Sequence, residues 1–202
     1  EIHTGKISSL VKSKKNYNLE LIRIKKSSYL ANELNMEVHA GHGLDYKTTR
    51  ILSKIDIIKE TLDIGDIHIK YNDILYIFER KTVKDLISSI HDGRYREQKA
   101  RMLSTYNQRY LSYIIEDDDI ISSKVYSKNK STIQGAYINT MFRDNIRVLF
   151  TKKISETATL LLSIAVKIIE NPKKFTYVHS NENETLCYTD HIKLKKKKID
   201  NI

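Results

Sequence analysis

A chain of 202 residues, of which 40% are hydrophobic, can bury one good core or two small ones. The lone Cys187 excludes an intramolecular disulfide framework and suits a reducing compartment. No secretory signal is visible, so we expect an intracellular protein, in the nucleus of a eukaryote and in the cytoplasm otherwise. The formal net charge of +10 favours a polyanion such as nucleic acid as partner.

The first 58 residues predict a β/α segment, with a strand from Met36 to His39 and a helix from Lys47 to Ile55. Similarity to a known enzyme rests here on three stretches, residues 1–5, 19–26 and 39–46. They resemble the late β/α units of bacterial pyridoxine 5′-phosphate synthase, a TIM-barrel enzyme. The resemblance places His42 in an active-site position and implies phosphate contacts by His42 and Gly43. About a quarter of a barrel cannot close, so we do not expect vitamin synthesis from this segment.

Two interpretations of this N-terminal segment remain open. It either lends a strand to the edge of the sheet that follows, or it is an unrelated fusion. Metal binding by His39 and His42 is a weaker alternative, because two histidines without a third partner are more often loop residues.

The next elements predict a β-hairpin. Its strands, Ile67 to Tyr71 and Ile74 to Phe78, are rich in β-branched and aromatic residues and flank the two-residue turn Asn72-Asp73. A two-residue loop fixes the register, which places Asp66 opposite Glu79 on one face of the hairpin. The sequence therefore predicts a pair of neighbouring carboxylates.

Side chains next to this pair extend the predicted site. Lys81 is two residues beyond Glu79 and projects from the same face, whereas Arg80 points away from it. Two oxygen ligands that leave room for water and phosphate suit Mg²⁺. The alternative is a surface hairpin that carries a Glu/Lys pair.

A helix is predicted after the hairpin, because apolar residues recur at helical spacing from Val83 to Ile90, with an end near Asp92-Gly93. Thr82 and Asp85 have the spacing of a capping box, so we favour a supporting role for Asp85 over metal ligation. A basic run follows next to the proposed metal site, where a DNA backbone would lie. Its candidate DNA contacts are Arg94, Arg96, Gln98, Lys99 and Arg101.

The rest of the region predicts further α/β elements. We expect strands at 110–115 and 147–150 and helices at 131–142 and 157–170. The acidic run Glu116 to Asp119 is a second candidate metal site of lower rank, because a polar loop after a strand is the commoner outcome. The last helix is far short of the roughly 18 apolar residues of a membrane span, and residues 173–202 read as a basic tail or linker.

Two motifs carry a second resemblance: G-D at 65–66 with E-R-K-x-x-x-D at 79–85, and S-I-H-D-G-R-Y-x-x-Q-K at 89–99. They resemble the nuclease domain of the XPF/Mus-type structure-specific endonucleases, and the similarity extends over about residues 60–171. We therefore expect three regions: the β/α segment 1–58, the nuclease domain 59–172 and the tail. The resemblance implies an α/β fold with a restriction-nuclease-like central sheet flanked by helices.

The same resemblance assigns roles to individual residues. It implies Asp66 and Glu79 as metal-binding acids, Lys81 as the basic catalytic residue, and Arg80 and Asp85 as further members of the catalytic set. It also implies Mg²⁺ or Mn²⁺ as cofactor, cleavage of branched duplex DNA such as 3′ flaps and forks, and action as a homo- or heterodimer with a second nuclease-fold subunit. No membrane partner is expected.

One motif of that family is missing. Nuclease domains of this type open with an acidic strand, V-D-x-R-E, and the nearest comparable stretch here is the basic run Leu21 to Lys26. The leading hypothesis is thus an endonuclease for DNA repair or recombination. One alternative is a catalytically silent partner subunit that binds branched DNA, and a remote one is a protein related to pyridoxine 5′-phosphate synthase.

Overall fold

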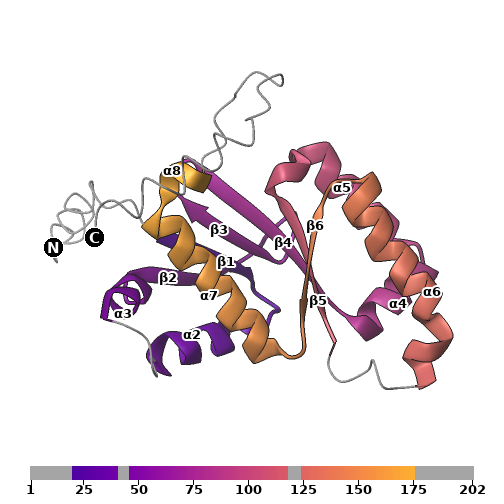
Figure 1. The fold of residues 1–202 in the computed structure, drawn as a ribbon, viewed down its shortest axis with the longest axis horizontal. Coiled ribbons are helices and arrows are strands. Elements are labelled where there is room, and N and C mark those ends of the chain that lie inside the picture. The colour runs from indigo at the N-terminus through magenta and orange to yellow at the C-terminus, as the bar shows by residue number, and fades with distance from the viewer. Residues whose placement is uncertain (1–19, 41–45, 118–123, 176–202) are drawn as a thin grey trace, which may run out of the picture.

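The structure is a computed structural model that describes residues 20–40, 46–117 and 124–175 (Figure 1). Several predictions concern residues outside these ranges: the phosphate contacts of His42 and Gly43, part of the acidic run at Asp118 and Asp119, and the basic tail beyond Phe175.

A mixed six-stranded sheet forms the centre of the molecule, in the strand order β2-β1-β3-β4-β5-β6. Strand β1 runs parallel to β2 and antiparallel to β3, β3 and β4 form an antiparallel hairpin, and β4, β5 and β6 run parallel. The strands span Glu20–Lys25 (β1), Ile55–Glu60 (β2), Ile67–Tyr71 (β3), Ile74–Thr82 (β4), Leu111–Glu116 (β5) and Arg147–Thr151 (β6).

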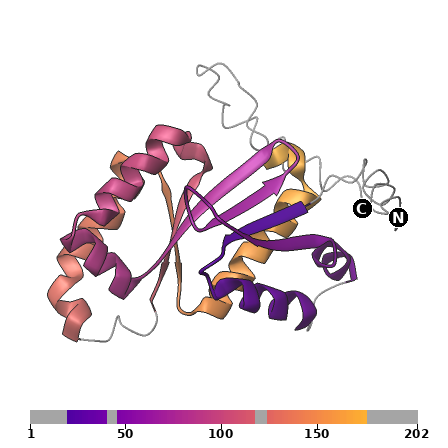
Figure 2. The ribbon, with the colours of Figure 1, turned by 180° about the vertical axis from the view of Figure 1, so that it is seen from behind.

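Helices cover both faces of this sheet. Helices α2, α3 and α7 gather on one face, and α4, α5 and α6 on the other (Figure 1 and, from behind, Figure 2). Their bounds are Leu30–Ala40 (α2), Tyr46–Leu52 (α3), Val83–His91 (α4), Arg94–Thr105 (α5), Lys124–Ile138 (α6), Ile154–Glu170 (α7) and Pro172–Phe175 (α8), with a 3₁₀ turn at Gln108–Tyr110 (η1) and a π-helical turn at Asn139–Arg143 (η2). The predicted α/β fold with a central sheet flanked by helices is confirmed.

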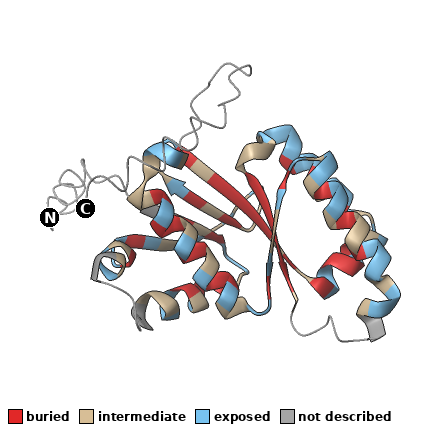
Figure 3. Ribbon diagram, in the orientation of Figure 1, coloured by how far each residue is buried: buried red, intermediate tan, exposed pale blue. Residues whose placement is uncertain are grey.

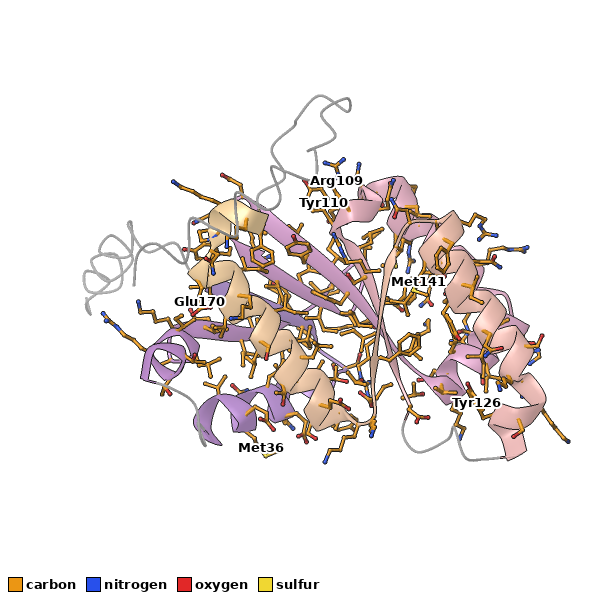
Figure 4. All side chains as sticks on the ribbon, viewed as in Figure 1. Met36, Arg109, Tyr110, Tyr126, Met141 and Glu170 are labelled. Carbon is orange, nitrogen blue, oxygen red and sulfur yellow. The ribbon has the colours of Figure 1, made fainter. Side chains whose placement is uncertain are left out.

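Alternation along β4 divides the interior into two cores. Phe78 packs in the core under α2 and α7, whereas its neighbour Ile77 packs in the core under α4 and α5. Side chains of both helix layers fill the space against the sheet (Figure 4), and the buried residues line the inner sides of both layers (Figure 3). All six residues of β5 are buried, because helices cover this strand on both faces.

The predicted hairpin forms with the predicted register. Ile67 pairs with Phe78 and Tyr71 pairs with Ile74, as a two-residue loop requires. Asn72, the first residue of the turn, has a φ of 51°, a left-handed conformation that asparagine tolerates better than most residues.

The strand predicted from Met36 to His39 is wrong, because these residues lie in α2. Leu30, Leu34 and Val38 recur every four residues and place one face of α2 in the core shared with α7. That helical periodicity prevails over the β/α arrangement from which the strand was predicted. The predicted helix from residue 47 is present as α3, but it ends at Leu52 and β2 begins at Ile55.

Among the described residues, no helix has both the length and the apolar character that crossing a membrane requires.

Candidate functional site

Asp66 lies beside β4 just past the end of the hairpin pairing. Its backbone N–H donates to the Phe78 carbonyl oxygen at 2.8 Å, and its Oδ2 accepts a hydrogen bond from the Arg80 backbone N–H at 3.0 Å. This places Asp66 next to Glu79, where burial first and the negative charge of Asp66 second raise the pKa of Glu79. The structure thus brings the two predicted carboxylates together.

Gly65 makes this approach possible. Its φ is +74°, and a Cβ at this position would lie 2.7 Å from Ile77 Cγ2 and 3.1 Å from the Phe78 carbonyl oxygen. Only a residue without a side chain fits both the backbone conformation and the space. The glycine therefore sets the position of the acid that follows it.

Glu79 and Lys81 form an ion pair on one face of β4. Lys81 Nζ lies 3.2 Å from Glu79 Oε1, and both side chains are buried. The prediction that Lys81 shares the face of Glu79 is confirmed. An ammonium held here is close enough to the carboxylates to contact a phosphate or a water bound between them.

Arg80 points to the opposite face, as predicted. Its Nε donates to Glu116 Oε2 at 2.9 Å, and its Nη2 pairs with the other oxygen of the same carboxylate. Glu116 also accepts a hydrogen bond from the Thr157 hydroxyl at 2.7 Å. These contacts join β4, β5 and α7, so Glu116 is engaged in structure rather than available to a metal.

Thr82 caps the start of α4, and Asp85 supplies the backbone N–H that the Thr82 side chain binds. The Asp85 N–H donates to Thr82 Oγ1 at 3.1 Å, and the Asp85 side chain is exposed. The helix start predicted from the capping-box spacing is present. This contact uses the backbone alone, so the supporting role of the Asp85 carboxylate stays a prediction.

Lys25 is a member of the site that the sequence did not point out. It ends β1, its Nζ lies 3.5 Å from Asp66 Oδ1, and its backbone N–H donates to the Asp66 carbonyl oxygen at 2.9 Å. Alternation in β1 explains the contact: Ile22 and Ile24 enter the core under α2, so Lys25 projects from the face that carries Asp66 and Glu79.

Three of the predicted DNA contacts, Arg94, Arg96 and Arg101, are exposed on α5, the helix that begins after Gly93. Arg94 Nε lies 2.6 Å from Asp92 Oδ2, and this hydrogen bond lowers the pKa of the aspartate. The partly buried Gln98 has a shielded Oε1 with no hydrogen-bond partner in the described part of the chain.

Lys99 differs from its neighbours because it is buried. Its Nζ lies 2.7 Å from Asp144 Oδ2 and 3.1 Å from the Thr140 hydroxyl, and 4.8 Å from the centre of the Tyr95 ring. These contacts join α5 to η2, the π-helical turn that follows α6, and to its capping residue Asp144. A direct phosphate contact by Lys99 would require this pair to open.

Tyr113 is a second residue that the sequence did not single out. It pairs with Glu79 across β4 and β5, its ring is 5.5 Å from that of Tyr95, and its buried hydroxyl has no partner among the described residues. Burial, followed by the negative charges around it, Glu79 and Asp66 among them, raises its pKa. The hydroxyl is therefore neutral at physiological pH.

The carboxylates suit a hard divalent cation. Mg²⁺ binds through one or two carboxylates and keeps several waters, and Asp66 and Glu79 supply this set. In the described ranges, no group of three or more His, Cys, Asp or Glu side chains is placed to hold a metal. Of the second candidate site, Glu116 is paired with Arg80, and Asp118 and Asp119 lie outside the described residues. The site lies toward the carboxyl end of β4, the end that leads into α4.

Comparison with known proteins identifies two kinds of relative. Crossover junction endonuclease MUS81 of Debaryomyces hansenii is 31% identical over 139 residues, which cover 64% of this chain and 21% of that protein. Pyridoxine 5′-phosphate synthase of Pelagibacter ubique is 63% identical over 60 residues, 30% of this chain and 25% of the enzyme. The chain thus spans a quarter or less of each relative, and both predicted resemblances are confirmed.

A solved structure supports the fold. XPF from Aeropyrum pernix superimposes with a TM-score of 0.56 at 20% identity, over 76% of this chain and 67% of that one, and its complex with DNA gives a TM-score of 0.50. The ERCC4 domain family matches residues 37–164, well over half of the chain. The chain therefore belongs to the ERCC4 domain family.

Proposed function

We propose that this chain is a metal-dependent, structure-specific DNA endonuclease domain that hydrolyses phosphodiester bonds in branched DNA, such as 3′ flaps, forks and junctions, during repair or recombination. The observation that carries the proposal is the placement of Asp66, Glu79 and Lys81 together beside the β3–β4 hairpin. The similarity to a crossover junction endonuclease supports DNA as the substrate.

The residues of the site divide the work between them. Asp66 and Glu79 would hold Mg²⁺ or Mn²⁺, which when bound activates water and stabilises charge on the phosphate. Lys81, held by Glu79, is positioned to orient the scissile phosphate through its ammonium group. Arg80 and Asp85 act on the site indirectly, Arg80 by fixing β4 to β5 and Asp85 through the start of α4.

DNA contact is proposed for the exposed face of α5. Arg94, Arg96 and Arg101 project from this helix, and their charges suit a phosphate backbone, with Gln98 next to them. Lys99 would support this face from below through its pair with Asp144.

Three broader assignments belong to the same proposal. The domain acts as a homo- or heterodimer with a second nuclease-fold subunit, and it works where the DNA is, in the nucleus of a eukaryotic cell or the cytoplasm of a bacterial one. The chain divides into three regions: the N-terminal β/α segment (residues 1–58), the nuclease domain (59–172) and the basic tail or linker (173–202). The pairing of β1 with β3 favours a first segment that contributes a strand to the nuclease sheet over an unrelated fusion.

The experiment that tests the proposal is cleavage of labelled flap, fork, nicked-junction and linear duplex DNA, with Mg²⁺, with Mn²⁺ and with a chelator. We expect nicking of the branched substrates that depends on the metal and exceeds nicking of the linear duplex. Metal-independent nicking, or equal nicking of linear and branched DNA, would contradict the proposal.

A second candidate function is favoured by the ion pairs of the site. Lys25 and Lys81 each pair with one of the two carboxylates, an arrangement that also suits a catalytically silent subunit. Such a protein would bind branched DNA with a strong salt dependence but would show no metal-dependent cleavage in the same assay.

A further inference from the structure

Charge at the two carboxylates is balanced within the chain itself. Asp66 faces Lys25 at 3.5 Å and Glu79 faces Lys81 at 3.2 Å, so two negative groups meet two positive ones. A divalent cation that binds Asp66 and Glu79 would enter beside both ammonium groups. Its affinity therefore depends on whether either of them can move away.

The two lysines differ in their freedom to move. The Lys81 side chain is 8% exposed and lies above the core formed with α4, whereas the Lys25 side chain is 47% exposed. The backbone of Lys25 is held by its hydrogen bond to Asp66 and by the pairing of β1. Its flexible side chain can turn into solvent while the backbone stays in place.

We propose that Lys25 is a built-in competitor for divalent cations at Asp66 and Glu79, one that lowers metal affinity and must turn away before a cation binds. The inference deepens the proposed function, on which its biological meaning rests, and assigns to β1 a role in setting the metal requirement. The Lys25 ammonium occupies the Asp66 oxygen that is not engaged by the Arg80 backbone.

Electrostatics gives the direction and size of the effect. A positive charge a few ångströms from a divalent cation opposes its binding, and removal of this partly exposed charge should tighten binding by about tenfold or more. Lys26, the next residue, is also exposed and lies in the turn after β1, where its backbone N–H donates to the Glu60 carbonyl oxygen at 3.0 Å. Lys26→Gln therefore makes the same change in net charge without removing the contact to Asp66.

The test measures binding of Mn²⁺, followed by electron paramagnetic resonance of the free ion, to the full chain and to Lys25→Gln, Lys25→Met and Lys26→Gln. Both substitutions of Lys25 should bind Mn²⁺ about tenfold more tightly than the parent, and Lys26→Gln should match the parent. Adding Asp66→Asn to Lys25→Gln should abolish the gain. Circular dichroism of each variant without metal checks that it is folded.

Several results would overturn the inference: equal affinity in the parent and both Lys25 variants, an equal gain in Lys26→Gln, a gain that persists with Asp66→Asn, or no Mn²⁺ binding by any variant. This readout is separate from cleavage. Tightened Mn²⁺ binding without cleavage of any DNA would uphold the inference and count against the proposed function. Equal Mn²⁺ binding by the parent and the Lys25 variants, together with metal-dependent cleavage, would overturn the inference and support the proposed function.

Discussion

Arg80 reaches from β4 to Glu116, the last residue of β5, and pairs with both oxygens of its carboxylate. Glu116 is buried, and the Thr157 hydroxyl of α7 donates to the same group. The contact fixes the carboxyl ends of two parallel strands on the face opposite to Glu79. Arg80 thus acts on the carboxylates by positioning the strand that carries one of them.

Replacement of Arg80 tests this role. Arg80→Met leaves the Glu116 carboxylate buried without its cation, so the free energy of unfolding should fall by about 3 kcal/mol. The matched control is Arg23→Met, which breaks the more exposed pair with Glu60 and should cost less than about 1 kcal/mol. Urea unfolding measures both. Equal losses in the free energy of unfolding would show that the pair with Glu116 stabilises the fold no more than the exposed pair with Glu60.

A substitution of Gly65 tests how closely the turn before β3 approaches β4. Gly65→Ala combines a left-handed backbone with a Cβ 2.7 Å from Ile77 Cγ2, so it should cost about 2 kcal/mol or more. Gly93→Ala shares the positive φ but meets no atom within 4 Å, and it should cost about 1 kcal/mol. The difference between their urea midpoints isolates the steric part. A Gly65→Ala variant no less stable than Gly93→Ala would rule out the close approach.

The raised pKa of Glu79 predicts a pH dependence of stability. Burial, and after it the charge of Asp66, lifts this pKa above its ordinary value of 4.5, so the native state binds the proton more tightly than the unfolded chain. The stabilising contribution of Glu79 is present below pH 4.5 and is lost as the pH rises through the raised pKa. Glu79→Gln cannot titrate. The free energy of unfolding of Glu79→Gln, relative to that of the parent, should therefore rise between pH 4.5 and neutrality.

Urea unfolding of the parent and Glu79→Gln at a series of pH values measures this gain. The absolute stabilities need not match, because the amide replaces the carboxylate beside Lys81; the readout is how their difference changes with pH. A difference that stays constant or shrinks would mean that the pKa of Glu79 is not raised.

Arg94 and Lys99 should respond differently to removal of their charge. Arg94→Gln should weaken binding of branched DNA and reduce the slope of log affinity against log salt by about 0.9, because one phosphate contact is lost. Its melting temperature should not change, since Arg94 is exposed. The control Lys54→Gln, on an exposed turn beside α3, should leave the slope unaltered.

Lys99→Met should lower the melting temperature, because it strands Asp144 without the ammonium group that it contacts at 2.7 Å. Thermal unfolding and salt-dependent fluorescence anisotropy measure the two effects. If Lys99→Met kept the parent's melting temperature yet lost the salt slope, Lys99 would be a direct DNA contact after all.

Local sequence signals were enough to predict the hairpin and its consequences. The two-residue turn at Asn72 fixed the register, and the period of two along β4 then placed Lys81 beside Glu79 and Arg80 on the other face. Helix α4 followed in the same way from its apolar spacing and its cap. These features depend on residues close together in the chain.

Long-range contacts and burial were harder to predict. The pairing of β1 with β3 joins segments more than 40 residues apart, so nothing local indicated that Lys25 would reach Asp66. Lys99 was hidden within a run of charges that resembles a solvated surface. A signal was present, because Tyr95, Lys99 and Met102 share the buried stripe of α5 at helical spacing.

The most direct test of the central claim is the single-turnover rate of Mg²⁺- or Mn²⁺-dependent nicking of a labelled 3′-flap duplex by the parent and by Glu79→Ala. Because Glu79 is one of only two acids proposed to hold the ion, the account predicts a rate in Glu79→Ala lower by about 100-fold or more. Flap binding should remain. Nicking by Glu79→Ala at the parent rate would contradict the assignment of this site.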